Sequence, residues 1–312
     1  MSVLEISGRI RENISKVIYG CETAKKLAIC AIFSEGHLLI NDVPGTGKTE
    51  LARALALSLG LDFRRLQFTP DLLPSDVTGI YYYNQKETEF VLRKGPIFTN
   101  ILLADEINRA TPRTQAALLE CMQERSATVD GETMDLPAPF FVIATMNPVE
   151  FGGTFPLPEA ELDRFMISAK MTYPEPQDER RIIDRAVARR EVSELAPCVT
   201  REEFDACREE IKNVHISDDV ADYIIRLVQA TREDERIRLG VSPRGTATLA
   251  RAAQTYAAME GRDFVLPDDI KALAVPVLAH RILSASQSSL RLGDSKEDII
   301  RYLLTKVPAP VI

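Results

Sequence analysis

Residues 41–50, NDVPGTGKTE, place two glycines, a lysine and a threonine at the spacing of a phosphate-binding loop. Backbone N–H groups of such a loop point toward a phosphate, and the N-terminus of the following helix adds partial positive charge. Lys48 would reach the β- and γ-phosphates of a nucleoside triphosphate, and Thr49 would hold Mg²⁺. Asp42 replaces the first glycine of the usual G-x-x-x-x-G-K-[ST] pattern, but the two glycines closest to the phosphates are retained. The predicted nucleotide-binding residues of this segment are Pro44, Gly45, Thr46, Gly47, Lys48, Thr49 and Glu50.

Two carboxylates follow the apolar run ILLA and complete the segment 101–106. At the tip of a strand, Asp105 can bind the Mg²⁺ shell, and Glu106 can orient and polarise an attacking water. This pair suits hydrolysis better than transfer to a substrate hydroxyl. An isolated Asp-Glu pair is also common at a solvated strand end, but its position 57 residues (105 − 48) after Lys48 favours the catalytic interpretation.

Three further polar residues have types that suit a nucleotide site. Asn147 ends the apolar run FFVIATMNP and would contact the γ-phosphate or the attacking water, although asparagine before proline is also an ordinary turn former. Arg164 lies in PLPEAELDRF, and Arg244 lies in the first turn of a predicted helix. Arginine is unfavourable for the helix dipole there, so a negative group such as a γ-phosphate is expected nearby. A surface salt bridge is the alternative for each arginine.

The elements that would position these residues follow an alternating pattern. The β-type runs HLLIND, RRLQF, ILLADE and FFVIATMNP alternate with segments of helical periodicity, which predicts a parallel sheet with helices on both faces. After MTYPEPQDERR the β-type runs stop, and helices are expected at 179–188, 201–212, 218–231, 243–260 and 267–280. The two prolines of YPEPQDE suit an extended linker. We therefore predict an α/β core over residues 1–175 and a smaller helical domain over residues 176–312.

Composition narrows the class of protein. The chain has 312 residues, 45% of them hydrophobic, and its 38 Lys and Arg against 46 Asp and Glu give a net charge of −8. This balance disfavours nucleic acid as a partner. Five cysteines without a C-x-x-C pair and three histidines predict reduced, packed thiols and no metal cluster. No apolar run approaches the ~20 residues of a membrane span, so the chain is expected to be cytoplasmic.

These features resemble, in chain order, the motifs of AAA+ ATPases. The glycine loop resembles Walker A, and the Asp-Glu pair resembles Walker B. Asn147 resembles sensor 1, Arg164 resembles the arginine finger, and Arg244 resembles sensor 2. Four segments resemble the MoxR family in particular, and the match covers almost the whole chain. These segments are HLLINDVPGTGKT, LLADEINRATPRTQAALLECMQE, ATMNPVEFGGTFPLPEAELDRF and GVSPRGTATLARAA. The first glycine of the loop varies among MoxR-like sequences, which is compatible with Asp42. The resemblance also implies that Val17, Ile18, Tyr19 and Gly20 pack on adenine, with a buried helix entry as the alternative.

The resemblance to MoxR proteins carries expectations about assembly and partners. It implies a P-loop AAA+ core with an all-α lid and a ring, usually of six, that hydrolyses Mg-ATP at each interface, with Arg164 supplied by the neighbouring subunit. Arg244 would sense the γ-phosphate, of its own subunit or of a neighbour. MoxR-like proteins are thought to act as chaperones on client proteins, often with a partner that carries a von Willebrand factor A domain. In related motors inserted hairpins line the pore, so Tyr81, Tyr82, Tyr83 and Phe90 would contact a client or simply pack across strands.

Three other functions compete with this interpretation. A small-molecule P-loop kinase shares the loop, but Glu106 and Arg164 argue against it. A DNA-remodelling AAA+ motor resembling the minichromosome-maintenance helicases is disfavoured by the net charge of −8. A nucleotide-dependent binding scaffold, which hydrolyses too slowly to be an enzyme, is the third alternative.

Overall fold

The computed structural model of the chain describes residues 2–41, 45–146, 154–188, 192–285 and 295–310. Asp42, Pro44 and Asn147, which are among the residues singled out from the sequence, lie outside these ranges.

A parallel sheet of five strands forms the centre of the fold, in the order β2-β5-β8-β1-β9. Its strands are β1 (Leu38–Asn41), β2 (Phe63–Gln67), β5 (Ile101–Asp105), β8 (Phe141–Met146) and β9 (Ile167–Ala169). The four strands predicted from apolar runs are confirmed. The edge strand β9 was not predicted, because three residues are too few to show a strand pattern.

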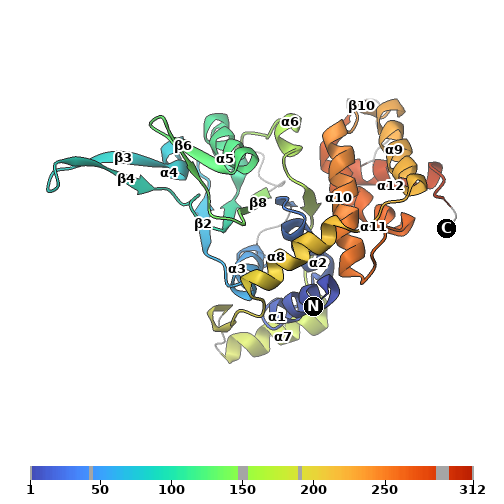
Figure 1. The fold of residues 1–312 in the computed structure, drawn as a ribbon, viewed down its shortest axis with the longest axis horizontal. Helices are drawn as coiled ribbons and strands as arrows, with labels where there is room; N and C mark the ends of the chain where they lie inside the picture. Colours follow the sequence, from blue (N-terminus) through green and yellow to red (C-terminus); the bar gives the residue numbers. More distant parts are fainter. Residues whose placement is uncertain (1, 42–44, 147–153, 189–191, 286–294, 311–312) are drawn as a thin grey trace.

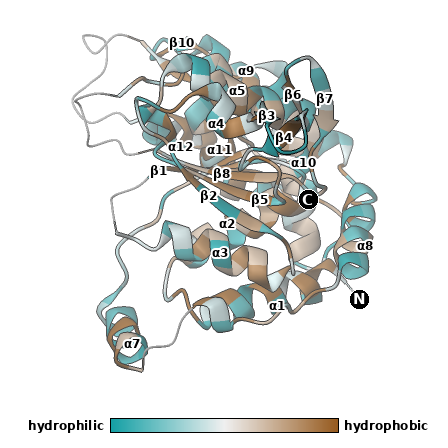
Figure 2. Ribbon diagram, turned by 90° about the vertical axis from the view of Figure 1, so that its left-hand side faces the viewer, coloured by the Kyte–Doolittle hydropathy of each residue, from teal (hydrophilic) through white to brown (hydrophobic). Residues whose placement is uncertain are grey.

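Helices cover both faces of the sheet (Figure 2). The helices on these two faces include α1 (Val3–Ser15), α2 (Glu22–Phe33) and α3 (Lys48–Ser58) on one side and α5 (Pro112–Glu124) on the other. Leu103 and Ile143 belong to the buried cluster that contains α1, α2 and α3, whereas Leu102 and Val142 belong to the cluster that contains α5. Because side chains alternate along a strand, one apolar run supplies both interfaces. The predicted α/β core is therefore confirmed.

The second part of the chain is mainly helical. Its helices are α7 (Pro176–Val187), α8 (Arg201–Lys212), α9 (Asp218–Glu233), α10 (Pro243–Met259), α11 (Pro267–Leu278) and α12 (Lys296–Lys306). The five predicted helices are confirmed to within a few residues, and α12 is additional. The expectation of no strands here was wrong, because β10 (Ile237–Leu239) and β11 (Leu283–Ser284) form a short antiparallel pair. Two- and three-residue strands leave no periodicity in a sequence.

Two antiparallel hairpins extend the core. The first joins β3 (Gly79–Asn84) to β4 (Glu89–Lys94), and the second joins β6 (Ser126–Val129) to β7 (Glu132–Asp135). Figure 1 shows the β3–β4 hairpin projecting far from the body. Tyr83 and Phe90 are cross-strand neighbours with ring centroids 5.5 Å apart, and the hydroxyl of Tyr81 donates a hydrogen bond to Glu132, 2.5 Å away. The hairpins are thus braced against each other.

The short elements complete the chain: α4 (Pro74–Thr78), α6 (Glu159–Leu162), and the 3-10 turns η1 (Ile107–Arg109), η2 (Val192–Glu194) and η3 (Ala279–Arg281). A single buried apolar cluster includes α1 and α2 from the first part and α10 and α11 from the second. The predicted boundary between residues 175 and 176 falls just before α7 and stays a prediction. None of the five cysteines, all within the described ranges, forms a disulfide. No helix in the described segments is both long and apolar enough to cross a membrane.

Candidate active site

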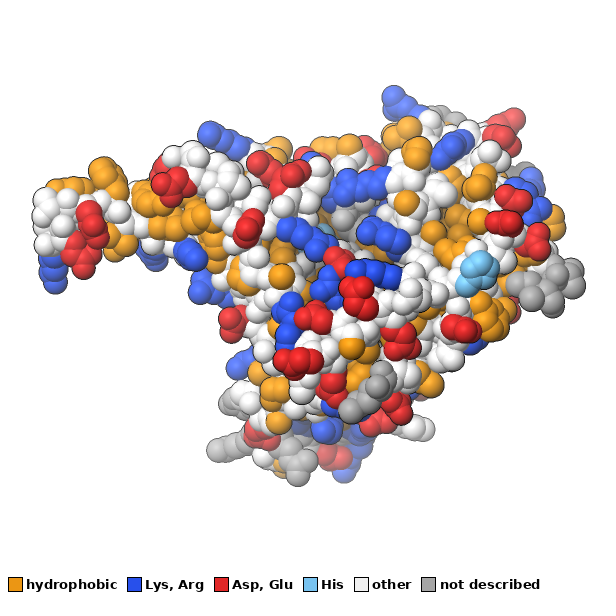
Figure 3. Space-filling view, in the orientation of Figure 1, with side chains coloured by type: hydrophobic (Ala, Val, Ile, Leu, Met, Phe, Trp, Pro, Cys, Tyr) orange, Lys and Arg blue, Asp and Glu red, His pale blue; other side chains and the backbone are white. Residues whose placement is uncertain are grey.

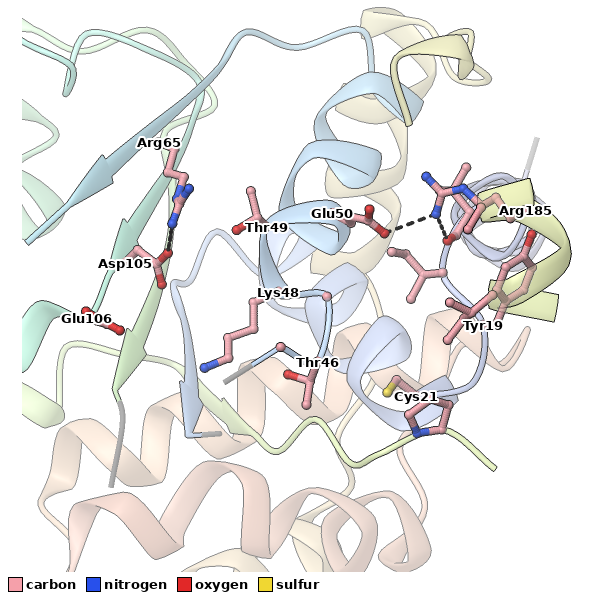
Figure 4. Close-up of a pocket in the computed structure, with 17 residues that line it drawn as sticks. Tyr19, Cys21, Thr46, Lys48, Thr49, Glu50, Arg65, Asp105, Glu106 and Arg185 are labelled. Carbon is pink, nitrogen blue, oxygen red and sulfur yellow. Dashed lines mark hydrogen bonds and ion pairs between the residues drawn. The ribbon is translucent and has the colours of Figure 1, made fainter. Parts of the chain in front are cut away.

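A cavity of about 600 Å³ opens beside the glycine loop. Figure 4 shows Lys48 and Thr49 between the carboxylates Asp105 and Glu106 on one side and Tyr19 with Arg185 on the other. We call it the loop cavity. It is lined by Val17, Ile18, Tyr19, Cys21, Gly45, Thr46, Gly47, Lys48, Thr49, Glu50, Arg65, Asp105, Glu106, Pro174, Ile182, Arg185 and Ala186.

The glycine loop has the backbone that a phosphate site needs. Gly45 and Gly47 have φ of 87° and 88°, a left-handed conformation that glycine adopts far more readily than other residues. A Cβ at either position would meet nothing within 4 Å, so the backbone conformation, and not a lack of space, requires glycine. Gly47 precedes the first residue of α3, Lys48, so the N-terminus of this helix, with its partial positive charge, lies at the loop.

Two strands beside β5 hold the Asp105 carboxylate. The hydroxyl of Thr145 on β8 donates to Oδ1 at 2.6 Å, and Nη2 of Arg65 on β2 donates to Oδ2 at 2.7 Å. The Asp105 side chain is only 14% exposed. Sequence reasoning missed Arg65 and Thr145, because the order of strands in the sheet brings them here and no local pattern reveals that order.

Glu106 is fixed by a separate set of contacts. Its φ is 54°, its backbone N–H donates to Oγ1 of Thr145 at 2.8 Å, and its Oε2 accepts from Gln67 Nε2 at 2.7 Å and Arg109 Nη1 at 3.0 Å. Gln67 lies on β2 two residues after Arg65, so both side chains extend from the same face of the strand. The carboxylate is therefore held at the cavity wall by β2 and η1, and β8 holds the backbone of Glu106.

The oxygen groups in the loop cavity suit Mg²⁺. A threonine hydroxyl and one carboxylate, supplied by Thr49 and Asp105, are the hard donors that Mg²⁺ accepts together with water and substrate phosphates. In the described ranges no group of three or more His, Cys, Asp or Glu side chains could hold a metal by itself.

The segment 17–21 forms another wall of the loop cavity. Val17 and Ile18 are buried and also line the cavity, so the two interpretations of this segment are both consistent with its position. Arg185 of α7, which sequence reasoning did not single out, donates to the carbonyl of Val17 at 2.6 Å and to Glu50 Oε2 at 3.1 Å. Gly20 lies in a left-handed turn with φ of 69° and is not among the lining residues.

Arg164 and Arg244 lie elsewhere, in a second cavity of about 190 Å³ between the end of α5, the segment after α6 and α10. We call it the arginine cavity. Its charged lining residues are Arg125, Arg164, Arg244, Arg251, Arg281, Glu35 and Asp163. Basic side chains gather near the middle of the face shown in Figure 3, over the region between α5 and α10. Within one copy of the chain, the two predicted arginines therefore lie in a different cavity from the predicted phosphate loop.

Positive charge in the arginine cavity is only partly offset. Arg125 pairs with Glu35 at 2.9 Å, and Arg281 pairs with Asp163 at 2.7 Å. Within the described ranges, the guanidinium groups of Arg164, Arg244 and Arg251 make no hydrogen bond or ion pair.

Two pKa shifts reflect this environment. Burial, followed by the nearby charges of Arg244 and Arg251, lowers the pKa of Arg281 to about 10, against the opposing effect of Asp163. Burial, together with the charges of Arg125 and Arg244, lowers the pKa of His37 to about 4, against the opposing effect of its hydrogen bond to the Met122 carbonyl. An anion in the cavity would offset the excess charge.

The chain is similar to known families and proteins over most of its length. A family described as "ATPase family associated with various cellular activities (AAA)" matches residues 37–167, and an AAA lid domain matches residues 229–302. The chain is 48% identical to the uncharacterized protein YeaC of Bacillus subtilis, over 97% of this chain and 95% of that one. It is 36% identical to the chaperone MoxR1 of Mycobacterium tuberculosis, over 96% and 81%.

Two more comparisons cover nearly the full length. The protein MoxR of Methylorubrum extorquens is 31% identical, over 98% of this chain and 96% of its own. A solved structure from Cytophaga hutchinsonii, described as a candidate ATPase, superposes with a TM-score of 0.91 at 39% identity, over 99% of this chain and 97% of the other.

Proposed function

The chain belongs to the MoxR family of AAA+ ATPases, and from this premise we propose that it forms a ring that hydrolyses Mg-ATP between neighbouring copies and remodels partner proteins. Each active site would combine the loop cavity of one copy with the arginine cavity of the next. A head-to-tail interface of this kind closes into a ring when its rotation allows, and we propose six subunits from the family resemblance.

The observation that carries the proposal is the separation of the two cavities within one chain. An arginine that stabilises the transition-state charge of phosphoryl transfer contributes about 10³ to 10⁵ in rate. The two arginines that line the loop cavity are both engaged, Arg65 with Asp105 and Arg185 with Glu50. The guanidinium groups of Arg164 and Arg244, which make no hydrogen bond or ion pair with the residues that the structure describes, line the arginine cavity. A second copy is the simplest source of an arginine for the phosphate.

The residues of the loop cavity would then act as follows. Backbone N–H groups of residues 45–49 and the ammonium of Lys48 bind the phosphates. Thr49 and Asp105 would hold Mg²⁺, which when bound neutralises charge on the β- and γ-phosphates. Glu106 orients the attacking water and accepts its proton. Asn147, the next residue after β8, would contact the water or the γ-phosphate from the adjacent strand.

Arg164 would contact the γ-phosphate of the neighbouring copy during hydrolysis. Since Arg244 lines the same cavity, we propose that it too acts on the neighbour's nucleotide. Loss of the γ-phosphate would remove the anion that both arginines share, so the packing of one copy on the next would change with each turnover. Hydrolysis would in this way produce motion.

Partner proteins are the proposed target of that motion. The relative MoxR1 is named a chaperone. The β3–β4 hairpin exposes Phe90 to 70% and Tyr82 to 46%, and it projects from the body as a client-binding element would (Figure 1). We propose that this hairpin contacts a client protein in the cytoplasm, and that a partner protein carrying a von Willebrand factor A domain takes part. We also propose that residues 1–175 form the core and residues 176–312 form the lid.

The test measures ATPase rate against protein concentration for wild type, Glu106→Gln, Arg164→Ala and an equimolar mixture of the two variants. We expect the rate per subunit to rise with concentration and each variant to lose most activity. In a random mixture about one interface in four pairs an intact loop cavity with an intact arginine, so activity should recover to at most about a quarter of wild type. Arg226→Ala, on the exposed side of α9, serves as the control and should remain active.

The same assay separates the alternatives. Turnover that does not depend on concentration, with a fully active Arg164→Ala variant, would refute the shared site. Added DNA should leave the rate unchanged, whereas stimulation would favour a DNA-remodelling motor. Release of one inorganic phosphate for each ATP consumed, without formation of a phosphorylated small molecule, would exclude a kinase. A wild-type ATPase rate no higher than that of Glu106→Gln would favour a nucleotide-dependent scaffold.

A further inference from the structure

A buried arginine holds the turn that contains Arg164. Arg281 follows α11, and its side chain is 1% exposed. Its Nε donates to Asp163 Oδ1 at 2.7 Å, its Nη2 donates to the carbonyls of Phe165 at 2.7 Å and Asp163 at 3.3 Å, and its Nη1 donates to the carbonyl of Met166 at 3.2 Å. One guanidinium therefore bonds to the residues on both sides of Arg164, and fixes the direction in which that side chain leaves the turn.

The same carboxylate holds the start of α10. Oδ2 of Asp163 accepts a hydrogen bond at 3.0 Å from the hydroxyl of Ser242, the N-cap residue of α10. The Ser242 oxygen in turn accepts from the N–H of Gly245 at 3.2 Å. Arg244 lies between these two residues. Asp163 thus joins the turn that carries Arg164 to the helix end that carries Arg244.

Gly245 permits this close packing. A Cβ at this position would lie 3.0 Å from Cδ of Arg281 and closer still to Cγ1 of Val241. A larger residue would have to displace the side chain of Val241 or of Arg281. The sequence SPRG therefore brings the helix end, the buried guanidinium and the Asp163 turn into one packed unit.

Stability alone does not explain a buried pair of charges here. Removing a guanidinium and a carboxylate from water is costly, and apolar residues of similar volume often replace such pairs without loss. A planar fork of donors can bind one carboxylate and several carbonyls at fixed angles, which neither an apolar side chain nor a lysine can do. The arrangement suits a positioning role better than a purely stabilising one.

We propose that Asp163 and Arg281 form a positioning pair that presents Arg164 and Arg244 together, as one unit, to the nucleotide of the neighbouring copy. The proposal rests on the proposed shared site. Neither residue of the pair contacts the nucleotide; both act through the two arginines.

The test uses the full chain with Asp163→Asn, which keeps the shape of the side chain, and Arg281→Lys, which keeps the charge but loses the fork. Each variant retains its own loop cavity. We expect kcat to fall about tenfold or more while the KM for ATP changes little, because misplacing a group that acts in the transition state costs rate more than binding. Mixing either variant with Glu106→Gln should restore activity to the level reached with Arg164→Ala.

A matched control separates positioning from stability. Asp269 of α11 is 3% exposed and pairs with Arg262 at 2.7 Å, so Asp269→Asn breaks another buried carboxylate–arginine pair. This control should lower the melting temperature and keep wild-type kcat at a temperature where it is folded. Melting curves with and without ATP report whether each variant is folded and binds nucleotide.

Three results would overturn the positioning role. The first is a wild-type kcat in Asp163→Asn. The second is that Glu106→Gln restores ATPase activity to Arg164→Ala but to neither Asp163→Asn nor Arg281→Lys, although both are folded. The third is a loss of kcat in Asp269→Asn as large as the loss in Asp163→Asn. Should Asp163→Asn not fold, the same measurements on Arg281→Lys decide the question. Failure of the Arg164→Ala mixture itself would instead refute the shared site.

Discussion

His37 should make the stability of the fold sensitive to acid. It precedes β1 and is 6% exposed. Its Nδ1 accepts a hydrogen bond from the N–H of Val142 at 3.0 Å, so its Nε2 carries the proton and donates to the carbonyl of Met122 at 3.1 Å. A second proton would break the bond to Val142 and place a charge beside Arg125 and Arg244. Burial first, and these charges second, lower the pKa of His37 to about 4.

The magnitude follows from the two pKa values. In the unfolded chain the pKa returns to 6.5, so between pH 6.5 and pH 4 the unfolded state binds more protons than the folded state. The free energy of unfolding is therefore highest above pH 6.5 and falls as the pH drops through this window. The change from 6.5 to about 4 corresponds to a total loss of about 3 kcal/mol. Burial also lowers the pKa of His280, which acts in the same direction.

Urea unfolding at about pH 7.5, about pH 6 and about pH 5 measures this loss. His37→Gln keeps one donor and one acceptor but cannot take up a proton, so its stability should fall less steeply, by up to about 1.4 kcal/mol per pH unit. His215→Gln changes an exposed histidine and should keep the wild-type slope. A wild-type slope in His37→Gln, or an imidazole that titrates near its ordinary pKa in the folded protein, would refute the reasoning.

Three predictions concern the loop cavity. Lys48→Ala should abolish the rise in melting temperature that ATP or ADP produces, because the phosphates lose their cation; an undiminished rise would contradict the assignment. Arg185→Met should weaken nucleotide binding about tenfold, as measured by calorimetry, because the carbonyl of Val17 loses a charge-assisted hydrogen bond of 2.6 Å. Unchanged affinity would show that α7 does not support the site. Cys21 lines the cavity, so nucleotide should slow its alkylation but not that of Cys198, and equal slowing at both would indicate a global effect.

Much of the site could be predicted because its residues follow strands and the spacing is local. The glycine loop follows β1, and Asp105 and Glu106 end β5 or follow it, so apolar runs alone indicate where they lie. The carboxyl ends of parallel strands meet at one edge, which brings these residues together whatever the detailed fold. Their roles as site residues remain predictions that the proposed variants test.

The supporting residues could not be predicted for a physical reason. Arg65 and Gln67 face the carboxylates only because β2 pairs with β5, and strand order is a tertiary property. Arg185 reaches the loop cavity only because α7 lies against residues 17–21. The buried pair of Asp163 and Arg281 joins positions that are 118 residues apart, and a charged residue in a sequence ordinarily indicates an exposed face.

Sheet topology explains why a single copy separates its arginines from its phosphate loop. β1 and β9 are parallel neighbours in which Leu38 pairs with Ile167, and the loop follows β1, so the phosphates belong at the carboxyl edge of the sheet. Arg164 comes just before β9 and therefore lies at the amino edge, where the N–H of Met166 donates to the carbonyl of His37 at 2.8 Å. No rotation of a side chain can carry Arg164 across the length of the strands between these edges. If Arg164 contacts a γ-phosphate, the nucleotide must be bound by another copy, whose carboxyl edge faces this amino edge.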